Sequence, residues 1–299
     1  MALKIFCRKI NISGASRFSE PGPLLLVANH PNSFFDAILI GALFHRPVHF
    51  LARGDAFNKP RHGRLLRFLN MIPVYRLSEG KDNLPLNETA FRRSKEVLAQ
   101  NGIVLIFIEG ICVHKHELQP FKKGAARIAW ESRNKEGFRV LPMGLAYDSF
   151  ERFGKNINLY TGELLLPSFL FPFLEEARNI RHFNGILQHE IEKRIVLPAK
   201  EPKDRNTGTL LLLPMATLGY MINQPFYRPI KKILITKTAG TVFYDSVLFG
   251  ILLLLYPVFL LILSAALLVS GISLTIVLLI FLFFPLSAYC AVQWRSTAR

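Results

Sequence analysis

A histidine and an aspartate follow an apolar run near the start of the chain. The stretch LLLVANHPNSFFDAILIG, residues 24–41, is apolar up to Ala28 and then presents Asn29, His30 and, six positions after the histidine, Asp36. Histidine is the side chain best suited to accept a proton near neutral pH. A carboxylate beside it can fix its tautomer and stabilise the imidazolium that forms. The pattern therefore predicts a general-base pair that activates a hydroxyl of the substrate.

The spacing of this pair makes a demand on the backbone. Two residues six positions apart on a regular helix are about 600° apart around its axis, so they point to different faces. His30 and Asp36 can meet only if the chain turns between them before a helix begins. Pro31, Asn32 and Ser33 favour such a turn and suit a helix N-terminus. For this block taken alone, a helix-capping loop with an incidental histidine is the alternative.

A second block joins an acid to a basic loop. In VLIFIEGICVHKHELQPFKKG, residues 104–124, an apolar run delivers Glu109 and Gly110 to its end, and Lys122 stands just before a helix-like segment. Backbone N–H groups at a helix N-terminus attract anions, and lysines add positive charge there. The block predicts a phosphate site, with a solvated basic loop as the alternative.

A third block, NMIPVYR, reads as a strand that ends at Arg76. Arginine can hold a phosphate or a carboxylate through two hydrogen bonds, although a single arginine at a strand end can also be an ordinary surface residue. His114 and His116 match no common zinc spacing, and no cysteine pair accompanies them, so we predict no metal site. Cys112 is expected to be a small packed side chain rather than an acyl-carrying thiol.

These blocks lie within alternating strand-like and helix-like segments. The apolar runs are continuous, which is typical of strands buried on both faces of a mostly parallel sheet. The alternation predicts an α/β fold in which helices flank a layered sheet, with His30 at the edge where such sheets bind ligands. Strands are expected at residues 24–28, 48–52, 72–76, 103–108, 139–147 and 157–159. Helices are expected at residues 35–43, 63–69, 87–100 (with Asn87 as N-cap), 123–131 and, as one or two helices, 173–196.

The C-terminal part has a different composition. A polar linker at residues 198–208 leads to an apolar segment at 210–222, whose 13 residues are too few to span a bilayer, so we expect an interfacial or re-entrant segment. Residues 247–269 and 272–291 carry no charge, and each is long enough to span a bilayer. Because only two residues separate them, they predict a transmembrane helical hairpin. A hairpin buried in a soluble core is the alternative, but these segments offer no polar face to water.

Charge is concentrated before this hairpin. Of 37 basic and 21 acidic side chains, only Asp245, Arg295 and Arg299 follow Gly240, which leaves the preceding residues with a net charge of +15. A basic body suits a nucleic acid, a phosphorylated substrate or an anionic membrane face, and the apolar tail favours the membrane. No nucleic-acid-binding motif is present.

The flanks of the hairpin predict its orientation. Basic residues precede the first span and follow the second, so both ends are expected on the cytoplasmic side. The basic residues before the first span are Lys231, Lys232 and Lys237.

The three cysteines fit no disulfide framework, and the N-terminus lacks the apolar core of a secretory signal, so we expect a reducing compartment.

Taken together, four blocks within residues 21–147 resemble the glycerolipid acyltransferase family, membrane enzymes that acylate glycerol 3-phosphate or lysophosphatidate. NHPNSFFD resembles the family's His–Asp block, with five residues between the pair where the commoner form has four. IPVYR is similar to the second block, whose arginine binds the substrate phosphate. FIEG with FKKG resembles the third block, whose glutamate, glycine and lysine line the glycerol-phosphate site. VLPMGL resembles the fourth, whose proline is thought to shape the acyl-donor side.

The resemblance implies a function. The implied protein is a membrane-bound acyltransferase of phospholipid synthesis. It would move a fatty acyl group from acyl-CoA or acyl carrier protein to a hydroxyl of glycerol 3-phosphate or lysophosphatidate. The resemblance implies no metal and no bound cofactor. Its catalytic residues would be His30 and Asp36. Its substrate-binding residues would be Arg76, Glu109, Gly110 and Lys122.

The chain is accordingly divided into three parts. We expect an acyltransferase α/β domain at residues 1–205, an interfacial or re-entrant segment with a basic linker at 206–240, and the transmembrane hairpin at 241–299. Two alternatives stay open: acylation of a different lipid acceptor, such as an amino-lipid, and a non-catalytic adaptor that binds anionic lipid.

Overall fold

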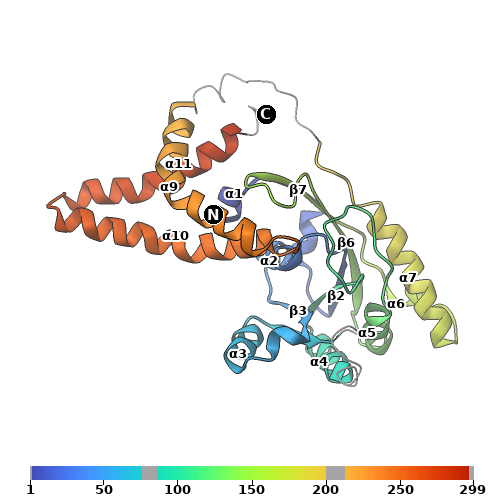
Figure 1. Ribbon diagram of the computed structural model, residues 1–299. Coiled ribbons are helices and arrows are strands. Elements are labelled where there is room, and N and C mark those ends of the chain that lie inside the picture. Colours follow the sequence, from blue (N-terminus) through green and yellow to red (C-terminus); the bar gives the residue numbers. More distant parts are fainter. Residues whose placement is uncertain (1, 76–85, 200–212, 296–299) are drawn as a thin grey trace.

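The computed structural model describes residues 2–75, 86–199 and 213–295 (Figure 1). A seven-stranded sheet with the order β1-β7-β6-β2-β5-β3-β4 forms the centre of the α/β domain. The five strands from β6 to β4 run parallel, whereas β7 runs antiparallel to β6 and β1 follows the direction of β7. The predicted mostly parallel sheet is therefore confirmed. Its strands are β1 Cys7–Ser13, β2 Leu24–Ala28, β3 Val48–Arg53, β4 Met71–Val74, β5 Ile103–Phe107, β6 Arg139–Tyr147 and β7 Lys155–Thr161.

Helices cover both faces of this sheet. The α-helices of the domain are α1 Ala2–Phe6, α2 Ser33–Leu43, α3 Pro60–Phe68, α4 Leu86–Ala99, α5 Gly124–Ser132, α6 Pro167–Leu170 and α7 Glu176–Glu192. Short 3-10 helices occupy η1 Ala15–Ser19 and η2 Gly54–Phe57.

The central strand β2 is buried on both sides, as its continuous apolar sequence predicts. Leu24, Leu26 and Ala28 face a core that includes side chains of α2 and of the first turns of α10 (Tyr244–Val269). Leu25 and Val27 face a second core, to which α4, α5 and α7 contribute. Because successive side chains of a strand point to opposite faces, this one strand ties the two cores together.

Two further helices complete the described part of the chain: α9 Leu213–Lys237 and α11 Leu274–Arg295. The helices α10 and α11 lie side by side and extend away from the α/β domain (Figure 1). They are long and apolar enough to cross a membrane, with mean hydropathies of 2.8 and 2.4. Leu254 and Ile262 of α10 are 69% and 66% exposed, so the protein does not cover this helix as a soluble core would. A turn at Ser270 and Gly271 joins the two helices, as expected for a hairpin.

Several boundaries differ from the sequence-based prediction. Strand β1 was not expected, because CRKINIS is mostly polar whereas the predicted strands are largely apolar runs; it forms at the sheet edge by pairing with β7. Asn87 is not an N-cap, since it is the second residue of α4 and its side chain binds the backbone N–H and carbonyl of Tyr75 at 2.7 and 2.8 Å. Leu213, inside the short apolar segment expected at 210–222, begins the 25-residue helix α9, which packs against α11 and α10.

Candidate active site

Two adjacent strand ends bring the first two sequence blocks together. Ala28 at the end of β2 pairs with Phe107 at the end of β5, so Asn29–His30 and Ile108–Gly110 leave the sheet side by side. On the other flank, the Asn29 amide donates to the Leu145 carbonyl at 2.9 Å and accepts from the Leu145 N–H at 2.8 Å. The backbone entering His30 is thus held from both neighbouring strands, at the edge where parallel sheets bind ligands.

The required turn between His30 and Asp36 is present. Helix α2 begins only at Ser33, whose backbone has a φ of 53°, in the left-handed region that non-glycine residues rarely adopt. Asp36 Oδ2 lies 2.9 Å from His30 Nδ1 and also accepts a 2.8 Å hydrogen bond from the backbone N–H of Asn32. Because Asp36 occupies Nδ1, the nitrogen left for a substrate is His30 Nε2.

A residue outside the four blocks completes this pair. The hydroxyl of Tyr147 donates to Asp36 Oδ1 at 2.6 Å, and both side chains are fully buried. Burial and the neighbouring carboxylate raise the pKa of Tyr147 well above its ordinary value, so the phenol keeps its proton. Strand β6 runs parallel to β2 but continues four residues past the level of Ala28, which brings Tyr147 over the loop.

The His30 ring is also oriented by packing. It stacks on Phe107, with ring centroids 3.8 Å apart and an angle of 8° between the planes. The side chain of His30 retains 14% exposure, whereas that of Asp36 is fully buried. An imidazole fixed on one face and at one nitrogen, with an accessible edge, is the geometry that general-base catalysis needs.

Glu109 lies against the same loop and is 4% exposed. Its pKa is raised to about 7, mainly because burial disfavours the carboxylate. Backbone hydrogen bonds from Gln119 and His30 oppose this shift, and the charge of Asp36 adds to it. Glu109 therefore changes its charge near neutral pH, close to the His30–Asp36 pair.

Gly110 and Lys122 lie next to each other. Gly110 has a φ of 63°, and a Cβ atom placed on it would come within 2.9 Å of Lys122 Cγ. The Lys122 N–H donates to the Ile108 carbonyl at 2.9 Å, while the lysine itself is exposed, two residues before α5. The structure thus brings together His30, Asp36, Glu109, Gly110 and Lys122. Arg76 lies outside the described residues, and Tyr75, the last described residue before it, follows the end of β4 at Val74.

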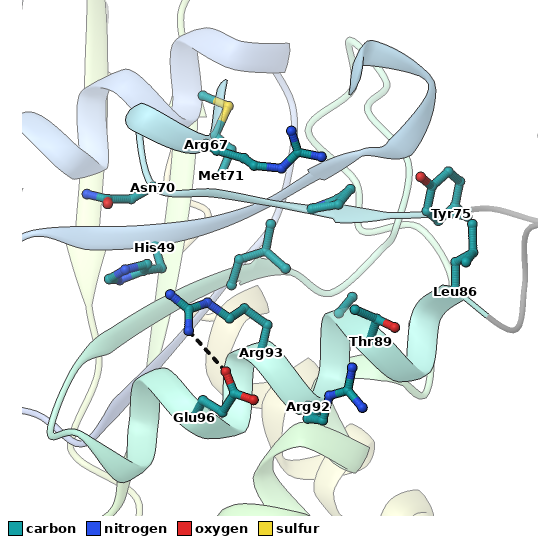
Figure 2. A pocket seen from close by; sticks show the side chains of 13 residues that line it. His49, Arg67, Asn70, Met71, Tyr75, Leu86, Thr89, Arg92, Arg93 and Glu96 are labelled. Carbon is teal, nitrogen blue, oxygen red and sulfur yellow. Dashed lines mark hydrogen bonds and ion pairs between the residues drawn. The ribbon is translucent and has the colours of Figure 1, made fainter. Parts of the chain in front are cut away.

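A cavity of about 480 Å³ lies between strand β4 and helix α4 (Figure 2). Three arginines, Arg67, Arg92 and Arg93, make its wall basic, and Arg93 binds Glu96 at 3.0 Å. Strand β4 is the outermost strand, separated from β2 by β3 and β5. The cavity is therefore not the site of the His30–Asp36 pair, although it extends to Tyr75.

Helix α10 also reaches the His30–Asp36 loop, which the sequence did not predict. Asp245 Oδ2 accepts a 2.7 Å hydrogen bond from the Asn32 side-chain amide, and Ser246 Oγ accepts one of 3.0 Å from the Phe35 N–H. The sequence feature that could have pointed to this contact is that Asp245 is the sole acidic residue after Gly240.

His114, His116 and Cys112 make packing and hydrogen-bond contacts. His114 and His116 stack against Phe150, with centroids 4.8 and 5.1 Å apart. Within the part of the chain that the structure describes, no three histidine, cysteine, aspartate or glutamate side chains are grouped to hold a metal ion. The thiol of Cys112 lies 2.9 Å from the Ser33 N–H, against the His30–Asp36 loop.

Residues 9–146 match the family model described as Acyltransferase. The α/β domain belongs to the acyltransferase family. The matched residues of this acyltransferase include all of the blocks that carry the resemblance in the sequence, and the chain is therefore an enzyme of this type.

One solved structure similar to this acyltransferase is the crystal structure of the 1-acyl-sn-glycerophosphate (LPA) acyltransferase PlsC from Thermotoga maritima. The two chains are 20% identical, and the match covers 63% of this chain and 73% of that one, with a TM-score of 0.45. No match was found among curated protein sequences.

Proposed function

We propose that this acyltransferase is membrane-bound and moves a fatty acyl group from a thioester, acyl-CoA or acyl carrier protein, to a hydroxyl of glycerol 3-phosphate or lysophosphatidate in phospholipid synthesis. The observation that carries the proposal is the 2.9 Å contact between His30 Nδ1 and a buried Asp36. That contact leaves Nε2 of a partly exposed imidazole as the proton acceptor.

The proposed reaction has two steps. His30 Nε2 takes the proton of the acceptor hydroxyl while its oxygen attacks the thioester carbonyl, and the carbonyl electrons move to the oxygen of a tetrahedral intermediate. The intermediate then collapses, the C–S bond breaks, and the leaving thiolate takes the proton from the imidazolium. Asp36 stabilises the imidazolium between the two steps, while the Tyr147 hydroxyl and the Asn32 N–H hold Asp36.

The acceptor phosphate would be bound beside this pair. We assign it to Lys122 and to Arg76, with Glu109 and Gly110 lining the polar end of the acceptor. The position of Lys122 beside Gly110, one strand from His30, supports this assignment. A lysine ammonium and an arginine guanidinium are the usual partners of a phosphate group.

The proposed lipid partner is an anionic membrane surface. Helix α3 supports it, because Phe68 and Leu65 are 83% and 57% exposed and the helix also carries Arg61, Arg64 and Arg67. An exposed helix that combines apolar and basic side chains suits the headgroup region of an anionic bilayer. In Figure 1, α3 and the α10–α11 hairpin project from the same side of the α/β domain.

We place the α/β domain on the cytoplasmic face and keep the division into residues 1–205, 206–240 and 241–299. Lys231, Lys232 and Lys237 lie before α10, where the positive-inside rule puts the cytoplasmic end of a span. Acyl-CoA and acyl carrier protein are cytosolic donors, so this placement gives the site access to them.

The test is an acyl-transfer assay with the purified full chain in lipid nanodiscs. Labelled acyl-CoA and acyl carrier protein are each offered with glycerol 3-phosphate, lysophosphatidate and an amino-lipid, and products are separated by chromatography. A labelled glycerophospholipid product is expected. Transfer to the amino-lipid alone would select the other acceptor class, and an inactive protein with all pairs would refute the proposal.

A further inference from the structure

Helix α10 contacts the loop that carries the His30–Asp36 pair through its first polar residues. We infer that Asp245 is a positioning residue, which holds Asn32 in place and through Asn32 fixes the geometry of the catalytic pair. The inference rests on the proposed role of His30 and Asp36, which Asp245 itself does not touch. It makes the membrane hairpin a part of the catalytic machinery as well as an anchor.

Asn32 forms the link between the two carboxylates. Its backbone N–H donates to Asp36 Oδ2 at 2.8 Å, and its side-chain amide donates to Asp245 Oδ2 at 2.7 Å. The same Asp36 oxygen contacts His30 Nδ1. Asn32 is fully buried, so bulk water does not compete for either hydrogen bond. A displacement of the Asn32 side chain would therefore move the backbone N–H that holds Asp36.

Ser246 provides a second contact from the same helix. Its Oγ accepts the N–H of Phe35, which is the third residue of α2. The first N–H groups of a helix have no partner within the helix, and they usually bind the side chain of the preceding residue. Here the preceding residue, Asn32, makes no such cap: its side-chain nitrogen donates to Asp245, and its Oδ1 accepts no hydrogen bond. Ser246 of α10 thus binds one of the first N–H groups of the helix that carries Asp36, and the Cys112 thiol binds another.

The charge of Asp245 is balanced inside the protein. It forms an ion pair with Lys155, the first residue of β7, and both side chains are fully buried. A buried carboxylate without a partner is strongly unfavourable, so Lys155 makes its position at the loop possible. Lys155 also ties the start of α10 to the sheet, which gives Asp245 a fixed position from which to hold Asn32.

The test compares two variants that differ in one hydrogen-bond acceptor. Both contain Lys155→Met, so that no buried lysine is left unpaired, combined either with Asp245→Asn or with Asp245→Leu. Asparagine and leucine have similar sizes, but only asparagine can accept the Asn32 amide. We expect the leucine variant to have a kcat at least about tenfold lower than the asparagine variant, with KM values for donor and acceptor within about twofold.

A second readout does not require turnover. The Nδ1–H resonance of His30 is followed by NMR of 15N-histidine-labelled protein in nanodiscs, because a hydrogen bond to a carboxylate moves this proton downfield. We expect the resonance to lie further upfield in the leucine variant than in the asparagine variant, because a displaced Asp36 accepts a weaker hydrogen bond from Nδ1. Equal kcat and equal Nδ1–H resonances in two folded variants would overturn the inference.

Wild type and His30→Ala are measured in the same assay to separate the two proposals. A wild-type protein without acyl transfer would refute the proposed function, while the Nδ1–H resonance of His30 would still test the role of Asp245. An active wild type whose two double variants behave alike would refute the role of Asp245 only.

An exchange of the two partners gives an independent test if the leucine variant does not fold. Asn32→Asp alone places two carboxylates face to face, and we expect it to be inactive. Adding Asp245→Asn restores one donor and one acceptor in reversed order, and the carboxylate now at position 32 keeps one negative charge in the cluster with Lys155, so we expect at least about tenfold more activity than with Asn32→Asp alone. No recovery in the exchanged protein would argue against a direct link between the two residues.

Discussion

The imidazole of His30 has one nitrogen bound by Asp36 and one face covered by Phe107. This leaves a single nitrogen at an accessible edge, and the catalytic assignment depends on that atom. The residues that hold Asp36, namely Tyr147 and Asn32, act through it and do not face the substrate.

The first prediction concerns this base. His30→Ala and Asp36→Asn are each expected to lower kcat by about 100-fold or more, because the proton acceptor is lost or its tautomer is wrongly set. Rates are measured with the acyl-transfer assay, and thermal unfolding confirms the fold. His189→Ala, on the exposed side of α7, is the matched control and should retain full activity. A His30→Ala protein with more than about a tenth of the wild-type rate would rule out this base.

The second prediction concerns the raised pKa of Glu109, about 7 against an ordinary 4.5. Between these values the folded protein keeps a proton that the unfolded chain releases, so its stability falls as the pH rises from about 4.5 to 7. Above pH 7 this loss of unfolding free energy is complete, and it is on the order of 3 kcal/mol. Glu109→Gln removes this penalty and should therefore stabilise the protein more at pH 8 than at pH 5.

Thermal unfolding of both proteins at the two pH values measures this difference. Glu136→Gln, at an exposed glutamate, serves as the control and should change stability by the same small amount at both values. A gain from Glu109→Gln that does not depend on pH would show that Glu109 ionises normally in the folded protein.

At this scale the sequence located the pair but not its partners. His30 and Asp36 are six residues apart, so their types and spacing were visible in one block. Tyr147 is 111 residues from Asp36 in the sequence, and Asp245 is 213 residues from Asn32. Only the pairing of strands and the packing of α10 bring these partners together. A local pattern cannot contain such contacts.

At the scale of elements, the loop before α5 supplies the third prediction. Lys122→Ala should raise the KM for the glycerol-phosphate acceptor several-fold and leave the KM for the thioester unchanged, because Lys122 lies beside Gly110 at the site. Lys123→Ala removes the same charge one residue further on, also from an exposed lysine, and should change neither constant. Equal effects of the two substitutions would indicate general electrostatic attraction instead of a phosphate contact.

Helix α3 supplies the fourth prediction. An environment-sensitive dye on Phe68→Cys should report an apolar surrounding when the protein is reconstituted with anionic lipid, because the exposed Phe68 lies among arginines. The same dye on Leu174→Cys, at another fully exposed apolar position, should remain in water. The three native cysteines are first replaced by alanine. A dye at position 68 that stays in water would remove α3 from the membrane contact.

The elements with strong apolar patterns were predictable from the sequence. The strand at 24–28 and the long strand at 139–147 agree with the structure residue by residue, because both are continuous apolar runs. Strand β1 was missed because its sequence is mostly polar and its only neighbour, β7, lies far along the chain. The length of α9 was missed because polar residues follow Ile222, and packing against α11 carries the helix onward.

At the scale of the whole molecule, the fifth prediction is the orientation of the hairpin. A cysteine introduced at Ser270, in the turn between α10 and α11, should react with a membrane-impermeant reagent only from the side opposite the cytoplasm. One introduced at Thr297, which lies outside the described residues, should react only from the cytoplasmic side. The measurement uses sealed vesicles of both orientations and a protein without its native cysteines. Reaction of both positions from one side would contradict a spanning hairpin.

The two partners of the buried ion pair are made at different times during synthesis. Lys155 leaves the ribosome 90 residues before Asp245, its partner. Until α10 has been made, the sheet therefore holds a lysine that must either stay in water or be buried without a counter-charge, which is strongly unfavourable. A chain that ends at Gly240 would be left permanently in this state. We therefore expect that a chain without the hairpin does not complete the folding of its α/β domain. We also expect that the protein becomes catalytically active only late in biosynthesis, after α10 has been made.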